Sequence, residues 1–167
     1  MKYLLCSLLA LGLTFNAMAD DKVVNPDSTG FKFTDTKVVK TTPVKDQHKS
    51  GTCWCYSTNS FFENEILRKS GKSIHLSEGF PVWHCYFDKA QKYIRMDGTI
   101  NFAEGGSAED VVYTWKTYGM VPNDVYTGMT YGDKKFETRE LTSALTGYVD
   151  VINKRQLKKL TPAWVDG

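Results

Sequence analysis

Apolar residues recur at helical spacing in four stretches of the chain, and turn-forming residues separate these stretches. The clearest stretch covers residues 53–70, where Phe62 and Ile66 lie one turn apart and Leu67 widens the apolar face. Gly71 follows directly, and glycine is the residue that most often ends a helix. We therefore predict a helix over residues 53–70.

Two further helices have recognisable first residues. Ser77 is a suitable N-cap for a second helix, and the apolar positions after it continue to about Ile94. A third helix begins at the capping box formed by Ser107 and Asp110, in which each side chain pairs with the other residue's backbone N–H. Gly119 marks the end of this third helix.

The segments outside these three helices are less regular. Residues 20–42 read as an extended, polar lead-in, in which the alternating Phe31 and Phe33 and the pair Val38 and Val39 favour one or two short strands. A fourth helix is predicted over residues 137–154.

The last residues have the pattern of a helix start. Thr161 is a suitable N-cap and Pro162 is favoured at the first helical position. A single turn is too short to be stable by itself, because helix nucleation is unfavourable. We interpret this segment as the opening of a fifth helix in a longer protein, and the alternative is a tail that packs Trp164 on the core.

The first nineteen residues have the organisation of a secretory signal peptide. Lys2 supplies a positive charge, an apolar run extends from Leu4 to Phe15, and Ala17 and Ala19 form a cleavage site of small residues. The run is shorter than the ~20 residues that a membrane span needs. We therefore predict cleavage after Ala19, export to the periplasm or the cell exterior, and no membrane span.

Composition and charge limit the class of protein. The chain has 167 residues, which corresponds to one domain or part of a larger one. Hydrophobic residues make up 41% and charged residues 24%, as in an ordinary globular core. The net charge of +2 is too small for a surface that neutralises phosphates, so a dedicated nucleic-acid binder is excluded.

Candidate chemistry concentrates in the loop before the first predicted helix. Cys53 opens that helix, where the positive end of the helix dipole favours the thiolate over the thiol. Gly51 allows a tight bend, and Gln47 offers a side-chain amide six residues before the cysteine. This amide and the Cys53 N–H could bind the negative oxygen of a tetrahedral intermediate. Cys53 is therefore the candidate nucleophile and Gln47 the candidate oxyanion donor.

A thiol-based metal or redox site is the weaker alternative for the same region. After cleavage of the signal peptide three cysteines remain, and Cys53 and Cys55 form a C-x-C pair that matches neither the C-x-x-C redox motif nor a zinc site. On one helix these two side chains point about 200° apart, so they cannot ligate one ion together. Cys85 and His84 would have to complete such a site. We predict no metal ion and no other cofactor.

Three motifs in order resemble the papain superfamily of cysteine peptidases. Gln47 followed by G-T-C-W at residues 51–54 and by Ser57 resembles the family's nucleophile motif. L-S-E at residues 76–78 is similar to the start of the family's second helix. Gly105 and Gly106, followed by a helix and by Y-G at residues 118–119, resemble the third motif.

The resemblance implies an α+β papain-like fold, of which this chain carries the mainly helical N-terminal half over residues 43–167. A β-rich half would follow beyond the chain. It also implies a peptide substrate and the hydrolysis of peptide bonds through a thiolate nucleophile, and it leaves open a homo-oligomeric full-length form.

The resemblance further assigns roles to single residues. Cys53 corresponds to the nucleophile and Gln47 to the oxyanion donor. Gly105 and Gly106 correspond to a backbone shelf that binds the substrate main chain in extended form, and Trp54 packs beneath the site. The second helix and the spacer before the glycines are most similar to bleomycin hydrolase and bacterial aminopeptidase C.

The family's catalytic histidine and asparagine are expected outside the chain. They lie ~130 to 150 residues beyond the cysteine, whereas 114 residues follow Cys53. The histidines present, His48, His75 and His84, are interpreted as loop, turn and helix residues. We therefore expect this chain alone to be inactive, and the alternative function is an exported, non-catalytic peptide-binding module.

Overall fold

A computed structural model describes residues 33–130, 132, 135–155 and 160–166. The chain divides into two units, Met1–Val38 and Val39–Gly167, and every helix of the described residues lies in the second unit. The predicted signal peptide lies outside the described residues, as does most of the lead-in. Residues 33–42 contain no strand, and Val38 and Val39 are exposed. The short strands predicted for the lead-in are therefore absent from its described part, because the described residues offer no sheet to which they could pair.

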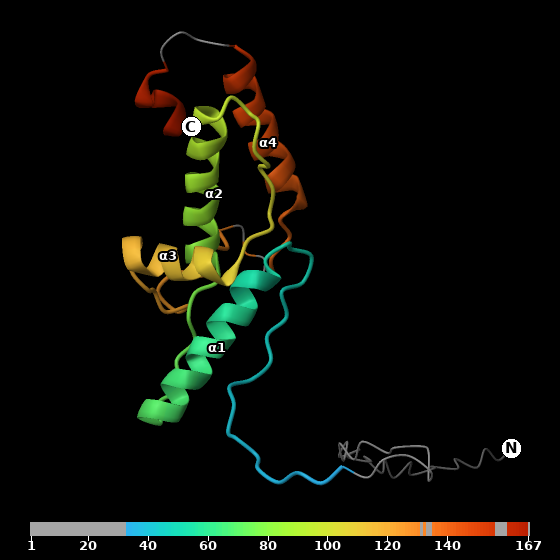
Figure 1. Ribbon diagram of the computed structural model, residues 1–167, viewed down its shortest axis with the longest axis vertical. Helices are drawn as coiled ribbons and strands as arrows, with labels where there is room; N and C mark the ends of the chain where they lie inside the picture. Colours follow the sequence, from blue (N-terminus) through green and yellow to red (C-terminus); the bar gives the residue numbers. More distant parts are fainter. Residues whose placement is uncertain (1–32, 131, 133–134, 156–159, 167) are drawn as a thin grey trace, which may run out of the picture. The chain divides into compact units, whose positions relative to one another are not determined.

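The second unit is helical. Four α-helices and one turn of 3₁₀-helix follow one another in the described residues, as Figure 1 shows: α1 Cys53–Ser70, α2 Gly79–Arg95, α3 Ala108–Tyr118, α4 Arg139–Lys154 and η1 Pro162–Val165. The described residues contain no sheet, only the isolated bridges Lys49–Glu137 and Leu76–Pro122. Within them no helix is both long and apolar enough to cross a bilayer.

The predicted starts and ends of α1 and α3 are confirmed. Gly71 adopts a left-handed conformation with φ of 71°, and its N–H donates to the Leu67 carbonyl at 2.9 Å. This conformation is the one that glycine adopts without strain, which explains why α1 ends there. Both halves of the Ser107–Asp110 capping box are formed, and Gly119 ends α3.

Two boundaries differ slightly from the sequence prediction. α2 begins at Gly79, yet the Ser77 hydroxyl still accepts a hydrogen bond from the Phe80 N–H at 3.0 Å. α4 begins at Arg139 instead of residue 137. A tertiary contact explains the later start of α4, because Glu137 forms a bridge with Lys49 just before the helix.

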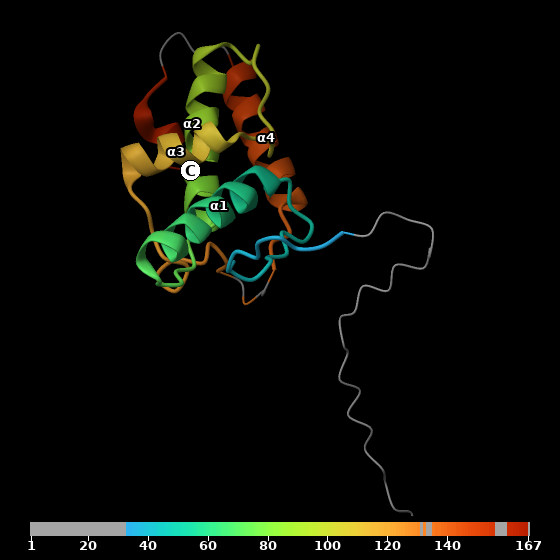
Figure 2. The ribbon, with the colours of Figure 1, turned by 60° about the horizontal axis from the view of Figure 1, so that its bottom comes forward.

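The four helices enclose one core. α3 packs against both α1 and α2, and α4 packs against α2, as Figures 1 and 2 show from two directions. The buried members of this core come from all four helices and from the segment between α2 and α3: Trp54, Cys55, Val82, Cys85, Tyr86, Ile94, Phe102, Val111 and Val149.

The C-terminal segment forms a single turn on this core. Pro162 occupies the first turn of η1 as predicted, and Trp164 packs against the core cluster. The Tyr148 hydroxyl donates to the Trp164 carbonyl at 2.6 Å, which attaches the turn to α4. The tail interpretation of this segment therefore describes its conformation correctly.

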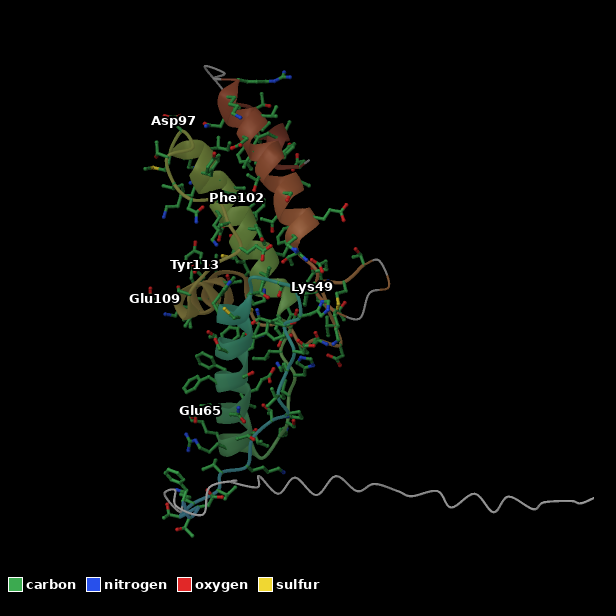
Figure 3. All side chains as sticks on the ribbon, turned by 90° about the vertical axis from the view of Figure 1, so that its right-hand side faces the viewer. Lys49, Glu65, Asp97, Phe102, Glu109 and Tyr113 are labelled. Atoms are coloured by element: carbon green, nitrogen blue, oxygen red, sulfur yellow. The ribbon has the colours of Figure 1, made fainter. Side chains whose placement is uncertain are left out.

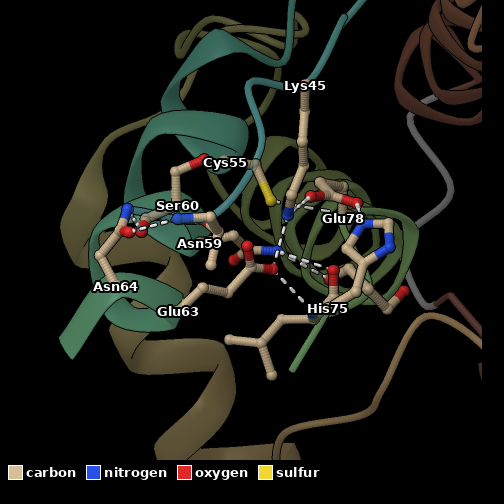
Figure 4. A network of polar contacts seen from close by, with 11 residues as sticks. Lys45, Cys55, Asn59, Ser60, Glu63, Asn64, His75 and Glu78 are labelled. Carbon is tan, nitrogen blue, oxygen red and sulfur yellow. Dashed lines mark hydrogen bonds and ion pairs between the residues drawn. The ribbon is translucent and has the colours of Figure 1, made fainter. Parts of the chain in front are cut away.

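A buried ion-pair network joins the segment before α1 to α1 and to the start of α2. Figure 4 shows the Lys45 ammonium between two carboxylates, 2.5 Å from Glu63 Oε1 and 2.6 Å from Glu78 Oε1. Glu63 is 1% exposed and its carboxylate also accepts the Leu76 N–H at 2.7 Å. His75 Nε2 lies 3.4 Å from Glu78 Oε2. This network fixes the segment before the candidate nucleophile to the start of α2.

Three residues of this network are of the types that bind metal ions, and they form such a cluster within the described part of the chain. Donor atoms of Glu63, His75 and Glu78 all lie within 4.8 Å of one another. The Lys45 ammonium already occupies the space between the two carboxylates and supplies the cation that they require. The cluster is therefore an internal ion-pair network of the fold.

Candidate active site

Cys53 lies at the first position of α1, and its side chain is exposed. Thr52 precedes it, is 1% exposed, and its carbonyl accepts the N–H groups of Cys55 at 2.9 Å and Tyr56 at 3.2 Å. Among the described residues no acceptor contacts the Cys53 N–H itself. The first N–H groups of a helix have no partner within the helix. This N–H can therefore bind an oxygen atom that approaches the thiol.

Gln47 is held in the loop before Cys53. Its amide Nε2 donates to the Ser50 carbonyl at 2.7 Å, and the Ser50 hydroxyl donates back to the Gln47 carbonyl at 2.8 Å. Ser50 Oγ also lies 2.6 Å from Thr52 Oγ1, and both of these residues are buried. One amide hydrogen of Gln47 is used in this way, and the second has no acceptor within the described part of the chain.

Trp54 connects α1 to the segment that contains the two glycines. Its indole Nε1 donates to the Glu104 carbonyl at 3.0 Å, and its ring is 8% exposed. A Cβ atom on Gly106 would lie 2.6 Å from Trp54 Cε2, closer than any real contact. Gly106 is therefore required for the close packing of this segment on the residue that follows the candidate nucleophile.

The two glycines differ in what their backbone groups do. The Gly105 carbonyl accepts a hydrogen bond from Lys89 Nζ, which also donates to the Ala103 carbonyl at 3.0 Å. The Gly106 N–H and carbonyl have no hydrogen-bond partner in the described residues, and this residue is exposed. Lys89 thus fixes the segment, and the backbone of Gly106 remains available to a peptide.

Glu104 is a residue of this site that the sequence analysis missed. Its Oε2 accepts the Gly51 N–H, and its Oε1 accepts the Thr142 hydroxyl at 2.7 Å. Partial burial acts to raise the pKa of this carboxyl, but hydrogen bonds from Thr142 and from the Gly51 N–H outweigh it and lower the pKa. No signal in the sequence could have identified this residue, because the groups that it binds near Cys53 lie 50 and 53 residues away.

A groove opens between α1 and α3, beginning one turn after Cys53. It has a volume of about 590 Å³, and Figure 3 labels two of its lining residues on α3, Glu109 and Tyr113. The other lining residues are mostly apolar or small: Ser57, Thr58, Phe61, Phe62, Ala108, Val112 and Lys116. Phe61 is 61% exposed, so this groove presents an apolar wall to solvent.

All three histidines lie in the described part of the chain, and none of them contacts Cys53. His48 is exposed, with Nδ1 3.1 Å from the Phe136 carbonyl. His75 is paired with Glu78 in the ion-pair network. His84 stacks on Tyr118, with 3.8 Å between ring centroids. The structure therefore places the histidines in the loop, turn and helix positions that the sequence analysis gave them.

The three described cysteines occupy different environments and none is in a disulfide. Cys53 is exposed, whereas Cys55 is completely buried and Cys85 is 6% exposed. Burial raises the pKa of the Cys55 thiol, with a further contribution from the charge of Glu78, and burial also raises the pKa of Cys85. Because Cys53 faces solvent and Cys55 faces the core, they cannot share a metal ion.

We expect Cys53 to be the first of these three thiols to react with iodoacetamide. The reagent attacks the thiolate, and burial with a raised pKa suppresses the thiolate of Cys55 and Cys85. Peptide mass mapping after a short pulse at neutral pH measures this, with a pulse in denaturant as the control that labels all three. Faster native labelling of Cys85 than of Cys53 would contradict the proposed site.

Cys53 is thus exposed at a helix start, and Gly106 packs against the ring of the next residue, Trp54. The family model described as papain family cysteine protease matches residues 29–163. This match covers most of the chain, and the chain belongs to the papain family.

Curated relatives are similar at low identity. The chain is 30% identical to Cathepsin L2 of Homo sapiens over 103 residues, which cover 53% of this chain and 30% of that protein. It is 26% identical to Cysteine proteinase 1, mitochondrial, of Saccharomyces cerevisiae over 163 residues, 83% of this chain and 32% of the relative. Procathepsin L of Felis catus is 28% identical over 125 residues, 74% and 35% of the two chains. The chain thus spans about a third of the length of these relatives.

Proposed function

We propose that this chain is the nucleophile-bearing part of an exported cysteine peptidase that hydrolyses peptide bonds. The observation that carries the proposal is the position of Cys53, exposed at the start of α1 with an unpaired N–H. The nearby Gly106 backbone, also unpaired, lies against the ring of Trp54. Membership of the papain family makes a thiolate nucleophile the expected chemistry of this arrangement.

The geometry supports the following reaction. A peptide in extended form pairs its main chain with the N–H and carbonyl of Gly106. The Cys53 thiolate attacks the carbonyl carbon, and the Cys53 N–H and the second amide hydrogen of Gln47 donate to the resulting oxyanion. Collapse of this intermediate releases the amine, which takes up a proton, and leaves a thioester on Cys53. Water then hydrolyses the thioester to the acid and frees the thiol.

The groove between α1 and α3 gives this site a preference for apolar side chains. It begins at Ser57, one turn beyond Cys53, and reaches Ala108, two residues beyond Gly106. Its apolar wall would be covered by an apolar side chain of a bound peptide, and this burial stabilises the complex. We infer that peptides with a bulky apolar residue beside the cleaved bond are favoured.

The group that removes protons is expected from residues outside this chain, because none of the three histidines contacts Cys53. By the resemblance of α2 and of the spacer at residues 96–104, we assign the peptidase to the bleomycin hydrolase and aminopeptidase C type. Export is inferred from residues 1–19. N-terminal sequencing of the secreted protein should begin at Asp20, and a mature chain that still begins at Met1 would refute export.

A second candidate is a non-catalytic peptide-binding module. The observation that favours it is again the absence of a histidine contact to Cys53 among the described residues. In that case the Gly106 backbone and the groove would hold a peptide without cleaving it. Both candidate functions predict that the protein binds peptides, but only the peptidase hydrolyses them.

Hydrolysis of aminoacyl-aminomethylcoumarin reporters by the protein expressed from its natural gene tests the proposal. Cys53→Ala should lower kcat/KM at least about a thousandfold, since removing a nucleophile eliminates the covalent route. Cys85→Ala is the matched control and should retain activity, because Cys85 lies in the core. N-acetylation of the reporter should abolish turnover by an aminopeptidase.

Activity that survives Cys53→Ala would refute the proposal. Peptide binding measured by fluorescence polarisation, with no turnover of any reporter, would establish the binding module instead.

A further inference from the structure

One acidic side chain connects the loop before Cys53, the glycine segment and α4. The Glu104 carboxylate accepts the Gly51 N–H, and the Glu104 carbonyl accepts the Trp54 indole N–H at 3.0 Å. Gly51 and Trp54 flank Cys53 in the sequence. Two atoms of the same residue therefore hold the chain on both sides of the candidate nucleophile.

We propose that Glu104 is a positioning residue of the candidate active site, which sets how the nucleophile loop lies against the Gly106 backbone. The inference rests on the proposed function, since it assigns a role within that same site. Binding of the Gly51 N–H fixes the peptide plane two residues before Cys53. The orientation of this plane influences, through Thr52, the direction of the Cys53 N–H, which is the proposed oxyanion donor.

The space around Gly51 shows how closely the carboxylate approaches the loop. A Cβ atom at Gly51 would overlap the carboxylate and the Cβ of Glu104. Any side chain at residue 51 would therefore displace Glu104. The loop and the acid fit together only because residue 51 is a glycine.

The carboxylate is itself held from α4. Thr142 Oγ1 donates its single hydrogen to Glu104 Oε1, so the Tyr86 hydroxyl must donate to Thr142 across their 2.8 Å contact. Tyr86 belongs to α2 and is 8% exposed. A chain of hydrogen bonds thus runs from the core, through α4, to the nucleophile loop.

No disulfide joins the nucleophile loop to the glycine segment, because the three described cysteines are all free. The loop and the glycine segment are joined by the two bonds to Glu104 and by the packing of Trp54 on Gly106. Hydrogen bonds to a charged acceptor are stronger than neutral ones. Loss of the Glu104 side chain should therefore loosen the site without unfolding the helices.

Two reagents that both react with the Cys53 thiol distinguish the positioning of the nucleophile loop from the general reactivity of the thiol. A peptidyl fluoromethyl ketone must occupy the site to react, whereas iodoacetamide needs only an accessible thiol. The ratio of their second-order rate constants at Cys53 is the measured quantity. It is determined by mass spectrometry on the protein expressed from its natural gene, with Cys53→Ala as the control for labelling at other residues. Circular dichroism verifies that each variant is folded.

Glu104→Ala and Glu104→Asp should each lower this ratio roughly tenfold or more, because neither side chain reaches the Gly51 N–H and a hydrogen bond to a charged group is lost. Glu104→Gln should retain most of it, since its amide oxygen can accept from Gly51 and its nitrogen can donate to Thr142. Glu140→Gln removes an exposed carboxylate of α4 and should change nothing.

An unchanged ratio in Glu104→Ala would overturn the inference. If that variant does not fold, Thr142→Val decides, because it removes the support of the carboxylate, and Thr142→Ser should restore the ratio. Equal values for Thr142→Val and the unmodified chain would then refute the positioning role. A different failure would refute the proposed function itself: the unmodified protein expressed from its natural gene would react with the ketone no faster than free cysteine.

Discussion

Replacement of Lys45 by methionine is expected to lower the free energy of unfolding by about 3–5 kcal/mol. The Lys45 side chain is 15% exposed, and it pairs with Glu63 and Glu78, whose side chains are 1% and 4% exposed. Methionine keeps the length of the side chain but leaves two buried carboxylates without a cation. Urea unfolding followed by circular dichroism gives the free energy.

The matched control for this change is Lys49→Met. Lys49 and its partner Glu137 are 60% and 40% exposed, and 3.6 Å separates their charged atoms. An exposed ion pair of this kind contributes at most about 1 kcal/mol. Adding Glu78→Gln to Lys45→Met should recover part of the lost stability, because one unpaired charge is removed. Equal effects of the two lysine substitutions would contradict the buried network.

Gly106→Ala is expected to destabilise the chain by roughly 1–3 kcal/mol, the usual cost of overpacking a well-filled site. The added methyl group would lie within 2.6–2.9 Å of three atoms of the Trp54 ring. Either Trp54 or the glycine segment must then move away from Cys53. Thermal unfolding gives the stability, and the rate of reaction of Cys53 with the fluoromethyl ketone should fall in parallel.

The neighbouring glycine provides the control. A Cβ atom at Gly105 would have nothing within 4 Å, so Gly105→Ala should leave the melting temperature unchanged or slightly raised. If both alanine variants melt at the same temperature as the parent chain, Gly106 does not pack on Trp54 as described.

Local sequence signals were sufficient to predict the helices. The left-handed Gly71 and the Ser107–Asp110 capping box act within one or two turns, so the residues themselves determine where α1 ends and α3 begins. The start of α4 was missed by two residues because a long-range bridge between Lys49 and Glu137 determines it. No strand forms in residues 33–42, the described part of the lead-in, for a similar reason: a strand requires a partner strand, which alternation along the sequence cannot supply.

The residues of the candidate site likewise fall into those that a local motif predicts and those that only the tertiary structure brings together. Gln47, Cys53 and Trp54 belong to one short motif, so the sequence indicated them together. Glu104 lies 53 residues from Gly51 and 50 residues from Trp54, and only the packing of the glycine segment on α1 brings it to them. An acidic residue before two glycines has no local feature that reveals such contacts.

The burial of two of the three described cysteines also determines how these thiols respond to oxidants. Hydrogen peroxide can reach Cys53, while Cys55 and Cys85 lie in the core with raised pKa values. Oxidation should therefore begin at one atom, passing from a sulfenic acid that a thiol can reduce to sulfinic and sulfonic acids that persist. No described cysteine stands ready to trap the sulfenic acid as a disulfide. In an oxidising compartment the lifetime of the Cys53 thiol, more than the stability of the fold, would limit how long the protein works.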